Sequence, residues 1–186
     1  KPVRKPARKA APHEDLTRLR IHVTTIGDLL LSAADRYPDT LALVFPEQNY
    51  TYAELARRAL RRARSLQALG VRPRDHVGIL MHTCAEFVEL FFAIALCGGV
   101  IVPVNARYKS NELAYVIENG DLVTLLTNDS IADQVDFVER LNGALPDLGN
   151  QRDPLALRVS AAPRLRNIVV LGKGKPPGCV SAQAFE

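Results

Sequence analysis

The sequence has no tryptophan, one methionine and only three cysteines among its 186 residues. Cys84, Cys97 and Cys179 form no C-x-x-C pair and no other spacing that is typical of metal ligands. This scarcity argues against a disulfide-stapled secreted domain and against a structural zinc site. We therefore predict free thiols, a reducing compartment, a cytoplasmic location and no metal ligands in this chain.

Long apolar runs are also missing. The longest, Leu90–Val104, is interrupted by Gly98-Gly99 and by Pro103. It is shorter than the roughly 20 residues that a membrane-spanning helix needs. We interpret it as a buried helix joined to a buried strand. The basic start of the chain is not followed by an apolar stretch, so no secretory signal is predicted.

Several motifs that carry chemistry are absent. There is no G-x-G-x-x-G after the first predicted parallel strand, no G-x-S-x-G and no H-E-x-x-H. The one cluster of glycine and lysine, Gly172–Gly178, has two prolines and no hydroxyl residue. A phosphate-binding loop needs converging backbone N–H groups and usually a Ser or Thr before a helix. We predict a surface turn here and no catalytic residue in this chain.

The positive charge is concentrated at one end. Of the net charge of +4, residues 1–20 hold +5, from seven basic and two acidic residues, and the remainder is nearly neutral. We interpret residues 1–23 as a basic, irregular leader. Such a leader can contact anionic lipid or nucleic acid. A solvated leader is favoured over nucleic-acid binding, and peripheral membrane contact stays open.

The remainder shows the alternation of strands and helices that indicates an α/β fold. Two capping-box patterns, Thr25 with Asp28 and Thr51 with Glu54, predict helix starts. Further helices are expected over residues 83–96, 110–119 (capped by Ser110) and 130–141. The expected strands are Leu41–Phe45, Tyr50–Thr51, Val77–Met81, Val100–Val104, Leu122–Thr127 and Asn167–Leu171. The order predicts a mostly parallel sheet with helices on both faces, plus a short β-hairpin.

Parallel sheets bind ligands beyond the carboxyl ends of their strands. That rule selects His82 and Thr83 after one strand, and Asn105 and Arg107 after the next. A lone histidine at a strand end is more often structural, and asparagine after a strand more often makes a turn. These four residues are the only binding-site hypotheses that the sequence supports.

Three segments resemble the acyl-adenylate-forming, AMP-binding superfamily, which includes acyl-CoA synthetases, fatty-acid–CoA ligases and coumarate–CoA ligases. The segments are Thr51–Leu55, Gly70–Ile79 and Gly98–Asn105, reading TYAEL, GVRPRDHVGI and GGVIVPVN. Arg74 stands where the superfamily pattern usually has glycine. The resemblance identifies residues 24–171 as an N-terminal subdomain of such a ligase, followed by a flexible tail, residues 172–186, that leads toward the ATP-binding loop.

The resemblance implies that the parent enzyme uses ATP and Mg²⁺ to join a carboxylic acid to AMP, and then passes the acyl group to CoA. The phosphate loop, the magnesium ligands and the catalytic lysine of that superfamily have no matching positions here. We therefore expect a catalytically incomplete fragment whose partner is the remainder of its own ligase chain, with no tightly bound ATP, Mg²⁺ or CoA. A homodimer stays open.

Two alternatives remain at this point. One is a fragment of a sister ligase that loads the acyl-adenylate onto a carrier protein. The other is a non-catalytic α/β binding module that uses its basic leader. The acyl substrate is also open, because fatty, aromatic and sterol-derived acids share this N-terminal pattern.

Overall fold

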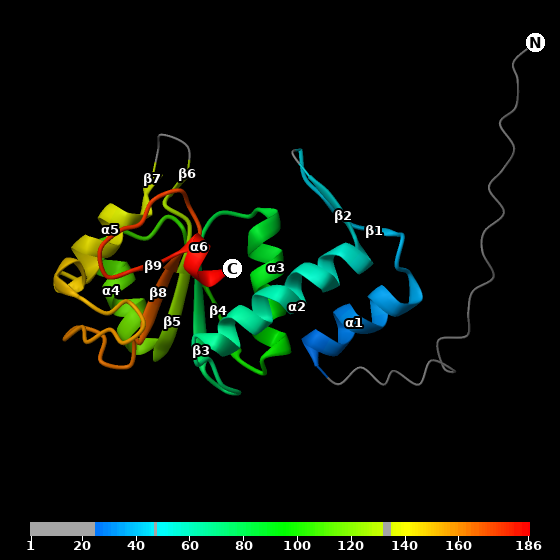
Figure 1. Cartoon of the computed structure of the whole chain (residues 1–186). Coiled ribbons are helices and arrows are strands. Elements are labelled where there is room, and N and C mark those ends of the chain that lie inside the picture. Colours follow the sequence, from blue (N-terminus) through cyan, green and yellow to red (C-terminus); the bar gives the residue numbers. More distant parts are fainter. Residues whose placement is uncertain (1–24, 47, 132–134) are drawn as a thin grey trace, which may run out of the picture.

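The computed structural model describes residues 25–46, 48–131 and 135–186. The predicted basic leader, residues 1–23, lies outside the described residues. The described part is an α/β structure with a five-stranded sheet at one end and a two-stranded hairpin at the other (Figure 1). Within it, no helix combines the length and the apolarity that crossing a bilayer requires.

The central sheet is parallel throughout. Its strand order is β4-β3-β5-β8-β9, with the bounds β3 His76–Leu80, β4 Val100–Val104, β5 Leu122–Thr127, β8 Asn167–Val170 and β9 Val180–Ser181. All six residues of β5 are buried, as expected for a parallel strand that is covered on both faces. This confirms the predicted fold class.

Helices cover both faces of the sheet. Leu113 of α4 (Ser110–Asn119) and Phe137 of α5 (Phe137–Ala144) pack on one face. Leu66 of α2 (Tyr52–Ala68) and Ile94 of α3 (Ala85–Leu96) pack on the other. Each face therefore has its own apolar core cluster, and burial of these side chains is the main force that holds the layers together.

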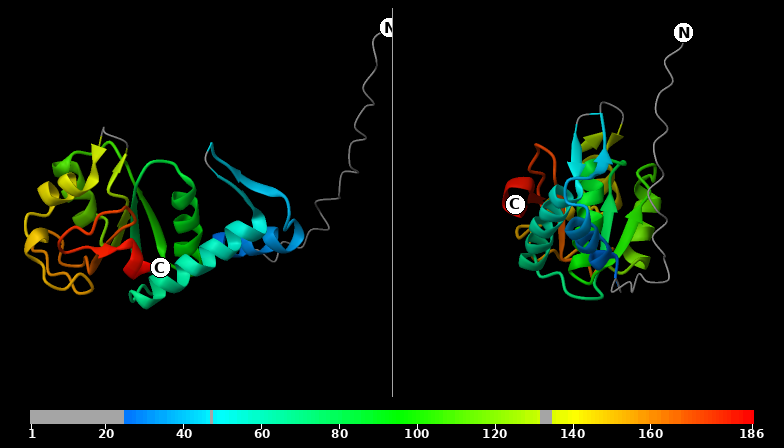
Figure 2. Two further views of the ribbon diagram at one scale, coloured as in Figure 1. Left: turned by 45° about the horizontal axis from the view of Figure 1, so that its top comes forward. Right: turned by 90° about the vertical axis from the view of Figure 1, so that its right-hand side faces the viewer.

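A third cluster joins α1 (Ile26–Arg36) and the hairpin β1 (Leu41–Val44) and β2 (Asn49–Thr51) to α2 and α3. Figure 1 and the left view of Figure 2 show α1 and the hairpin at the end of the molecule away from α4 and α5. The capping boxes predicted at Thr25 and Thr51 are both present, with reciprocal bonds of 2.9 to 3.2 Å.

The backbone at Arg74 shows why the superfamily pattern usually has glycine at this position. Its φ is +73°, in the left-handed region where a glycine has no steric penalty. Its backbone N–H donates to the carbonyl of Gly98 at 2.8 Å, which ties this turn to the one before β4. The glycine that the pattern prefers would suit this backbone better than arginine does.

Three of the predicted helices differ from the structure. The helix expected over residues 130–141 is instead a small hairpin, β6 (Ser130–Ile131) and β7 (Val135–Asp136), followed by α5, which Asp136 caps at 2.9 Å. Helix α3 begins at Ala85 with Cys84 as its cap, and α4 is capped by Lys109, so Ser110 is its first residue. These shifts change no layer of the fold.

The prediction of a flexible tail over residues 172–186 missed two elements. Strand β9 extends the sheet beside β8, and α6 (Ala182–Phe185) follows it. Val180 and Phe185 are buried against the α2–α3 face. Strands of two residues give no recognisable periodicity, so their partner in space defines them.

The burial of Cys179 leads to a prediction about pH. Its thiol is 4% exposed, and desolvation raises its pKa to about 11. An unfolded thiol ionises near pH 8.5. The stabilisation from the protonated thiol is therefore complete below that value and is lost as pH rises to about 11. We expect the free energy of unfolding to fall by about 2–3 kcal/mol more in the wild type than in Cys179→Ala over this range, measured by urea denaturation. Equal pH profiles would contradict this.

Candidate functional site

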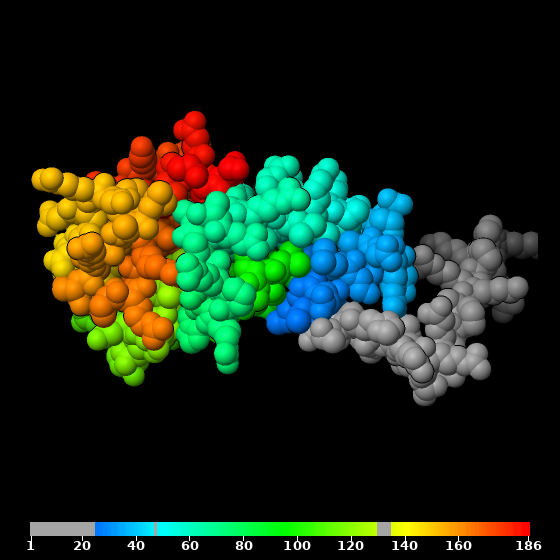
Figure 3. All heavy atoms as spheres, turned by 60° about the horizontal axis from the view of Figure 1, so that its bottom comes forward, coloured from blue at the N-terminus to red at the C-terminus, as the bar shows by residue number. Residues whose placement is uncertain are grey.

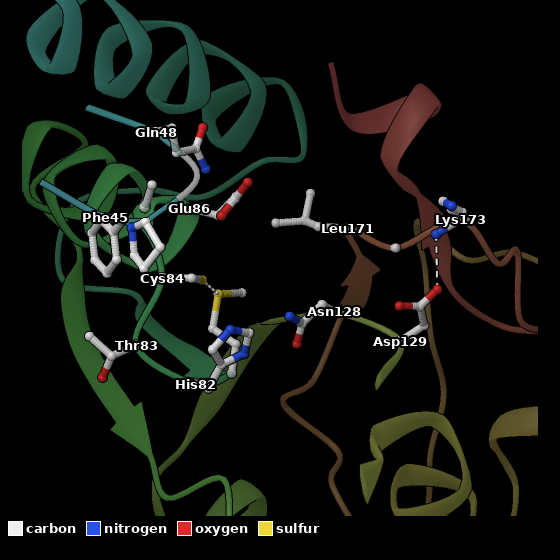
Figure 4. A pocket seen from close by; sticks show the side chains of 14 residues that line it. Phe45, Gln48, His82, Thr83, Cys84, Glu86, Asn128, Asp129, Leu171 and Lys173 are labelled. Carbon is white, nitrogen blue, oxygen red and sulfur yellow. Dashed lines mark hydrogen bonds between the residues drawn. The ribbon is translucent and has the colours of Figure 1, made fainter. Parts of the chain in front are cut away.

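A hollow with a volume of about 940 Å³ lies where β3, β5 and β8 end and α3 begins. The hairpin β1–β2 forms its far wall (Figure 4). Its lining residues are Phe45, Pro46, Gln48, Met81, His82, Thr83, Cys84, Ala85, Glu86, Asn128, Asp129, Leu171, Gly172 and Lys173. This is the sheet edge at which parallel α/β folds bind ligands.

The structure brings together two of the four residues that the sequence suggested. His82 and Thr83 line the hollow and are exposed to solvent. Asn105 and Arg107 do not line it. The Asn105 side-chain oxygen accepts a hydrogen bond from the backbone N–H of Arg107 at 3.0 Å, which closes a local turn.

Sequence reasoning missed Asn128, Asp129 and Lys173, although the signal was available. The rule about strand ends was applied to two strands only, whereas β5 and β8 were also predicted and end next to these residues. Thr127 anchors this edge, because its hydroxyl donates to the carbonyl of Leu80 at 2.6 Å and so links β5 to β3. The polar edge of the site is thus built on adjacent central strands.

The loop after β8 is organised around the Asp129 carboxylate. The carboxylate accepts hydrogen bonds from the backbone N–H groups of Lys173 at 2.9 Å and Gly174 at 3.4 Å (Figure 4). A side chain at Gly172 would collide with it, since an added Cβ would lie 2.0 Å from the carboxylate carbon. The backbone N–H groups of Lys173 and Gly174, which would have to bind the phosphate in a phosphate-binding loop, therefore bind a carboxylate of the protein itself. This arrangement is typical of a turn and differs from that of a phosphate-binding loop.

Two further polar side chains face this region. The Oδ1 atom of Asn128 is buried and has no hydrogen-bond partner in the described structure, so it can accept a bond from a donor that enters the hollow. Cys84 donates its thiol proton to the Met81 sulfur at 3.9 Å. Desolvation raises the pKa of the Cys84 thiol, so it stays protonated near neutral pH and is no activated nucleophile.

The residues present do not form a complete site for ATP and Mg²⁺. The hollow presents two carboxylates, Glu86 and Asp129, against one ammonium group, Lys173. A triphosphate would meet net negative charge here, whereas such sites normally supply converging cations and N–H groups. No group of three or more acidic, histidine or cysteine side chains that could hold a metal occurs in residues 25–46, 48–131 and 135–186.

Comparisons with known proteins agree with this architecture. The profile of the AMP-binding enzyme family matches residues 30–174, most of the chain. The chain is 32% identical over 157 residues to YngI, a candidate acyl-CoA synthetase of Bacillus subtilis, which covers 83% of the chain and 28% of YngI. It is 35% identical over 133 residues to a medium/long-chain-fatty-acid–CoA/3-oxocholest-4-en-26-oate–CoA ligase of Mycobacterium marinum, covering 72% and 23%.

Two further relatives widen the comparison. One of the subunits of mycosubtilin synthase from Bacillus subtilis is 34% identical over 117 residues, covering 63% of this chain and 4% of that protein. The o-succinylbenzoate CoA synthetase of Bacillus subtilis, solved with an acyl-adenylate intermediate, superimposes with a TM-score of 0.53 and 31% identity, covering 56% and 28%.

The chain spans between 4% and 28% of the length of these relatives. The match nevertheless includes the strands β3, β4, β5 and β8 of the sheet and the helices on both of its faces. It also includes the segments Thr51–Leu55, Gly70–Ile79 and Gly98–Asn105 on which the resemblance was first based. The fold and the position of the hollow agree with the sequence match. The chain belongs to the AMP-binding enzyme family of adenylate-forming ligases.

Proposed function

We propose that this chain is the N-terminal subdomain of an ATP-dependent ligase that joins a fatty acid, or another carboxylic acid, to CoA through an acyl-AMP intermediate. Family membership supports the adenylate-forming chemistry. Relatives named as fatty-acid–CoA and steroid-acid–CoA ligases support the acid–CoA reaction. A structural neighbour that holds an acyl-adenylate supports the intermediate.

One observation carries the proposal that the chain alone is incomplete. The hollow lies at the correct sheet edge, but its charged groups are two carboxylates and one lysine. Adenylate formation depends on positioning and on electrostatic stabilisation at the α-phosphorus of ATP, which the carboxylate attacks. When bound, ATP would supply the adenylyl group, Mg²⁺ would balance the charge of the departing pyrophosphate, and residues outside this chain would hold both. We assign to this chain the role of providing the edge of the sheet beside the hollow, where Thr127, Asn128 and Asp129 are held in position at the end of β5.

A second candidate acceptor has its own support. The matching mycosubtilin synthase polypeptide is 34% identical to the chain. A neighbouring solved structure joins an adenylation domain to a peptidyl carrier protein, with 27% identity and a TM-score of 0.54. These comparisons favour a fragment of a ligase that loads a carrier protein as the alternative to a CoA ligase.

Whether CoA or a carrier protein accepts the acyl group can be tested with the complete protein that the natural reading frame encodes. It would be incubated with ATP, Mg²⁺ and a mixture of fatty acids, and supplied with either CoA or a phosphopantetheinylated carrier protein. We expect acyl-CoA, detected by mass spectrometry, and no acyl-carrier product. Acylation of the carrier protein alone would overturn the CoA assignment and establish the alternative.

A further inference from the structure

The structure divides the five arginines of α2 into two groups. Arg58 and Arg62 turn inward, where both lie 3.4 Å from the buried carboxylate of Glu89. Arg58 also lies over the Tyr50 ring, and Arg62 over the Phe185 ring. Both guanidinium groups are therefore engaged within the domain, although the Arg58 side chain is 43% exposed.

The other three arginines form an unneutralised surface. Arg57, Arg61 and Arg64 are all exposed, and none has an ion pair with any residue of the described structure. Their spacing of four and then three residues places them on one side of the helix. Like charges at this spacing repel one another, so the arrangement weakens the isolated helix unless an anion from outside approaches it.

Apolar side chains share this side of the helix. Leu60 is 39% exposed and lies between the arginines, and Ala53 and Ala68 are exposed at the two ends of the row. We call this row the arginine stripe. Its acidic neighbour is Glu54, one turn before Arg57, whose carboxylate accepts a hydrogen bond from the backbone N–H of Thr51 in the capping box. Figure 3 shows α2, in cyan to teal, running across the face that is turned toward the viewer. The stripe is therefore an open surface of positive charge with an apolar residue within it.

We propose that the arginine stripe docks this protein on a membrane surface that contains anionic lipid. From Arg57 to Arg64 the helix rises by about 10 Å, so the stripe offers positions for several phosphates along its length. A fluid array of lipid headgroups can place a phosphate at each arginine, and Leu60 can enter the boundary between headgroups and acyl chains. No residue of the stripe lines the sheet-edge hollow, and the inference does not depend on the acyl acceptor.

Nucleic acid fits the stripe less well. Binding of single strands uses aromatic side chains on which bases stack, and reading of duplex bases uses several side chains that reach a groove together. The stripe has no aromatic residue, and Gln67 is the one amide side chain beside it. Lipid headgroups require only the charge and the apolar contact that are present.

The test is co-sedimentation of the 186-residue chain with vesicles made of equal parts phosphatidylcholine and phosphatidylglycerol, and with vesicles of phosphatidylcholine alone. We expect salt-sensitive binding to the anionic vesicles only. Each arginine near an anionic surface contributes roughly fivefold in affinity, so Arg57→Gln/Arg61→Gln/Arg64→Gln should weaken binding on the order of 100-fold. The matched control, Arg152→Gln/Arg158→Gln/Lys175→Gln, removes the same charge from exposed positions elsewhere and should retain most of the binding.

Three outcomes would overturn the proposal. Equal losses in the two triple variants would show an effect of total charge. Unchanged binding in the stripe variant would show that another part, such as the basic leader common to all variants, holds the vesicles. Binding of duplex DNA that the stripe variant loses, with no vesicle binding, would assign the stripe to nucleic acid. Circular dichroism spectra of all variants show that each is folded before binding is compared.

Discussion

Replacing Glu89 with alanine is expected to lower the free energy of unfolding by about 3 kcal/mol. Glu89 is 2% exposed in α3, and its two carboxylate oxygens lie 3.4 Å from the guanidinium groups of Arg58 and Arg62 on α2. Removing Glu89 leaves the largely buried Arg62 with the exposed carboxylate of Glu186 as its ion-pair partner, and the loss of the buried partner costs more than the pair itself contributes. Most of the loss comes from Arg62, because the Arg58 side chain is 43% exposed and keeps access to water.

The consequences of this change extend beyond α2 and α3. The Arg62 guanidinium also binds the carboxylate of Glu186 at 3.0 Å and lies 5.7 Å from the ring centre of Phe185. It therefore connects the end of the described chain to the α2–α3 layer. Loss of Glu89 should increase hydrogen exchange in α6 before the central sheet is affected.

Urea denaturation of Glu89→Ala and of Glu86→Ala provides a matched comparison. Glu86 is in the first turn of the same helix and has no ion pair in the described structure, so its removal should cost less than about 1 kcal/mol through the helix dipole. In Glu89→Leu/Arg62→Leu both charges are absent, and part of the stability should return. Equal losses for the two single alanine variants would show that the buried ion pair does not stabilise the layer as described.

Replacing Gly178 with alanine is the second change with a large expected effect, again about 3 kcal/mol. Gly178 has a φ of +72°, and an added Cβ would lie 2.4 Å from the backbone carbonyl oxygen of Leu148. The left-handed conformation and the collision with a backbone atom both oppose a side chain here. Because Gly178 lies two residues before the short strand β9, we expect the loss of stability to be concentrated at Val180 and Ser181.

Gly174→Ala is the natural control, since it lies in the same loop and an added Cβ has no neighbour closer than 3.9 Å. It should change the free energy of unfolding by less than about 0.5 kcal/mol. Urea denaturation gives the two differences, and hydrogen exchange of the Val180 and Ser181 amides locates the effect. If the two variants are equally stable, the close contact between Gly178 and Leu148 is not a feature of the folded protein.

Local sequence signals predicted most of the fold because they act over a few residues. The capping boxes at Thr25 and Thr51 specify helix starts whatever the rest of the chain does, and runs such as Leu122–Thr127 fit only a covered parallel strand. The helix predicted from residue 130 was wrong because Asp136, with Glu139 three residues on, begins the helix later. The sequence signal for this later start is Asp136 at the N-cap position with the acidic Glu139 in the first turn.

The remaining features depend on contacts between distant residues. Strand β9 has two residues and is defined by its pairing with Val169 and Val170. The hollow requires Asn128 of one strand end and His82 of another to lie at one edge, together with Phe45, Pro46 and Gln48 between β1 and β2. Only the strand order, which the sequence does not specify, shows that β3 and β5 are neighbours.

ATP–pyrophosphate exchange tests the proposed function most directly. It would be measured in the presence of fatty acid and Mg²⁺ for residues 1–186 and, side by side, for the complete protein from the natural reading frame. We predict fatty-acid-dependent exchange by the complete protein and none above background by residues 1–186. Exchange catalysed by the 186-residue chain itself, or its absence from the folded complete protein with every carboxylic acid supplied, would contradict the proposal.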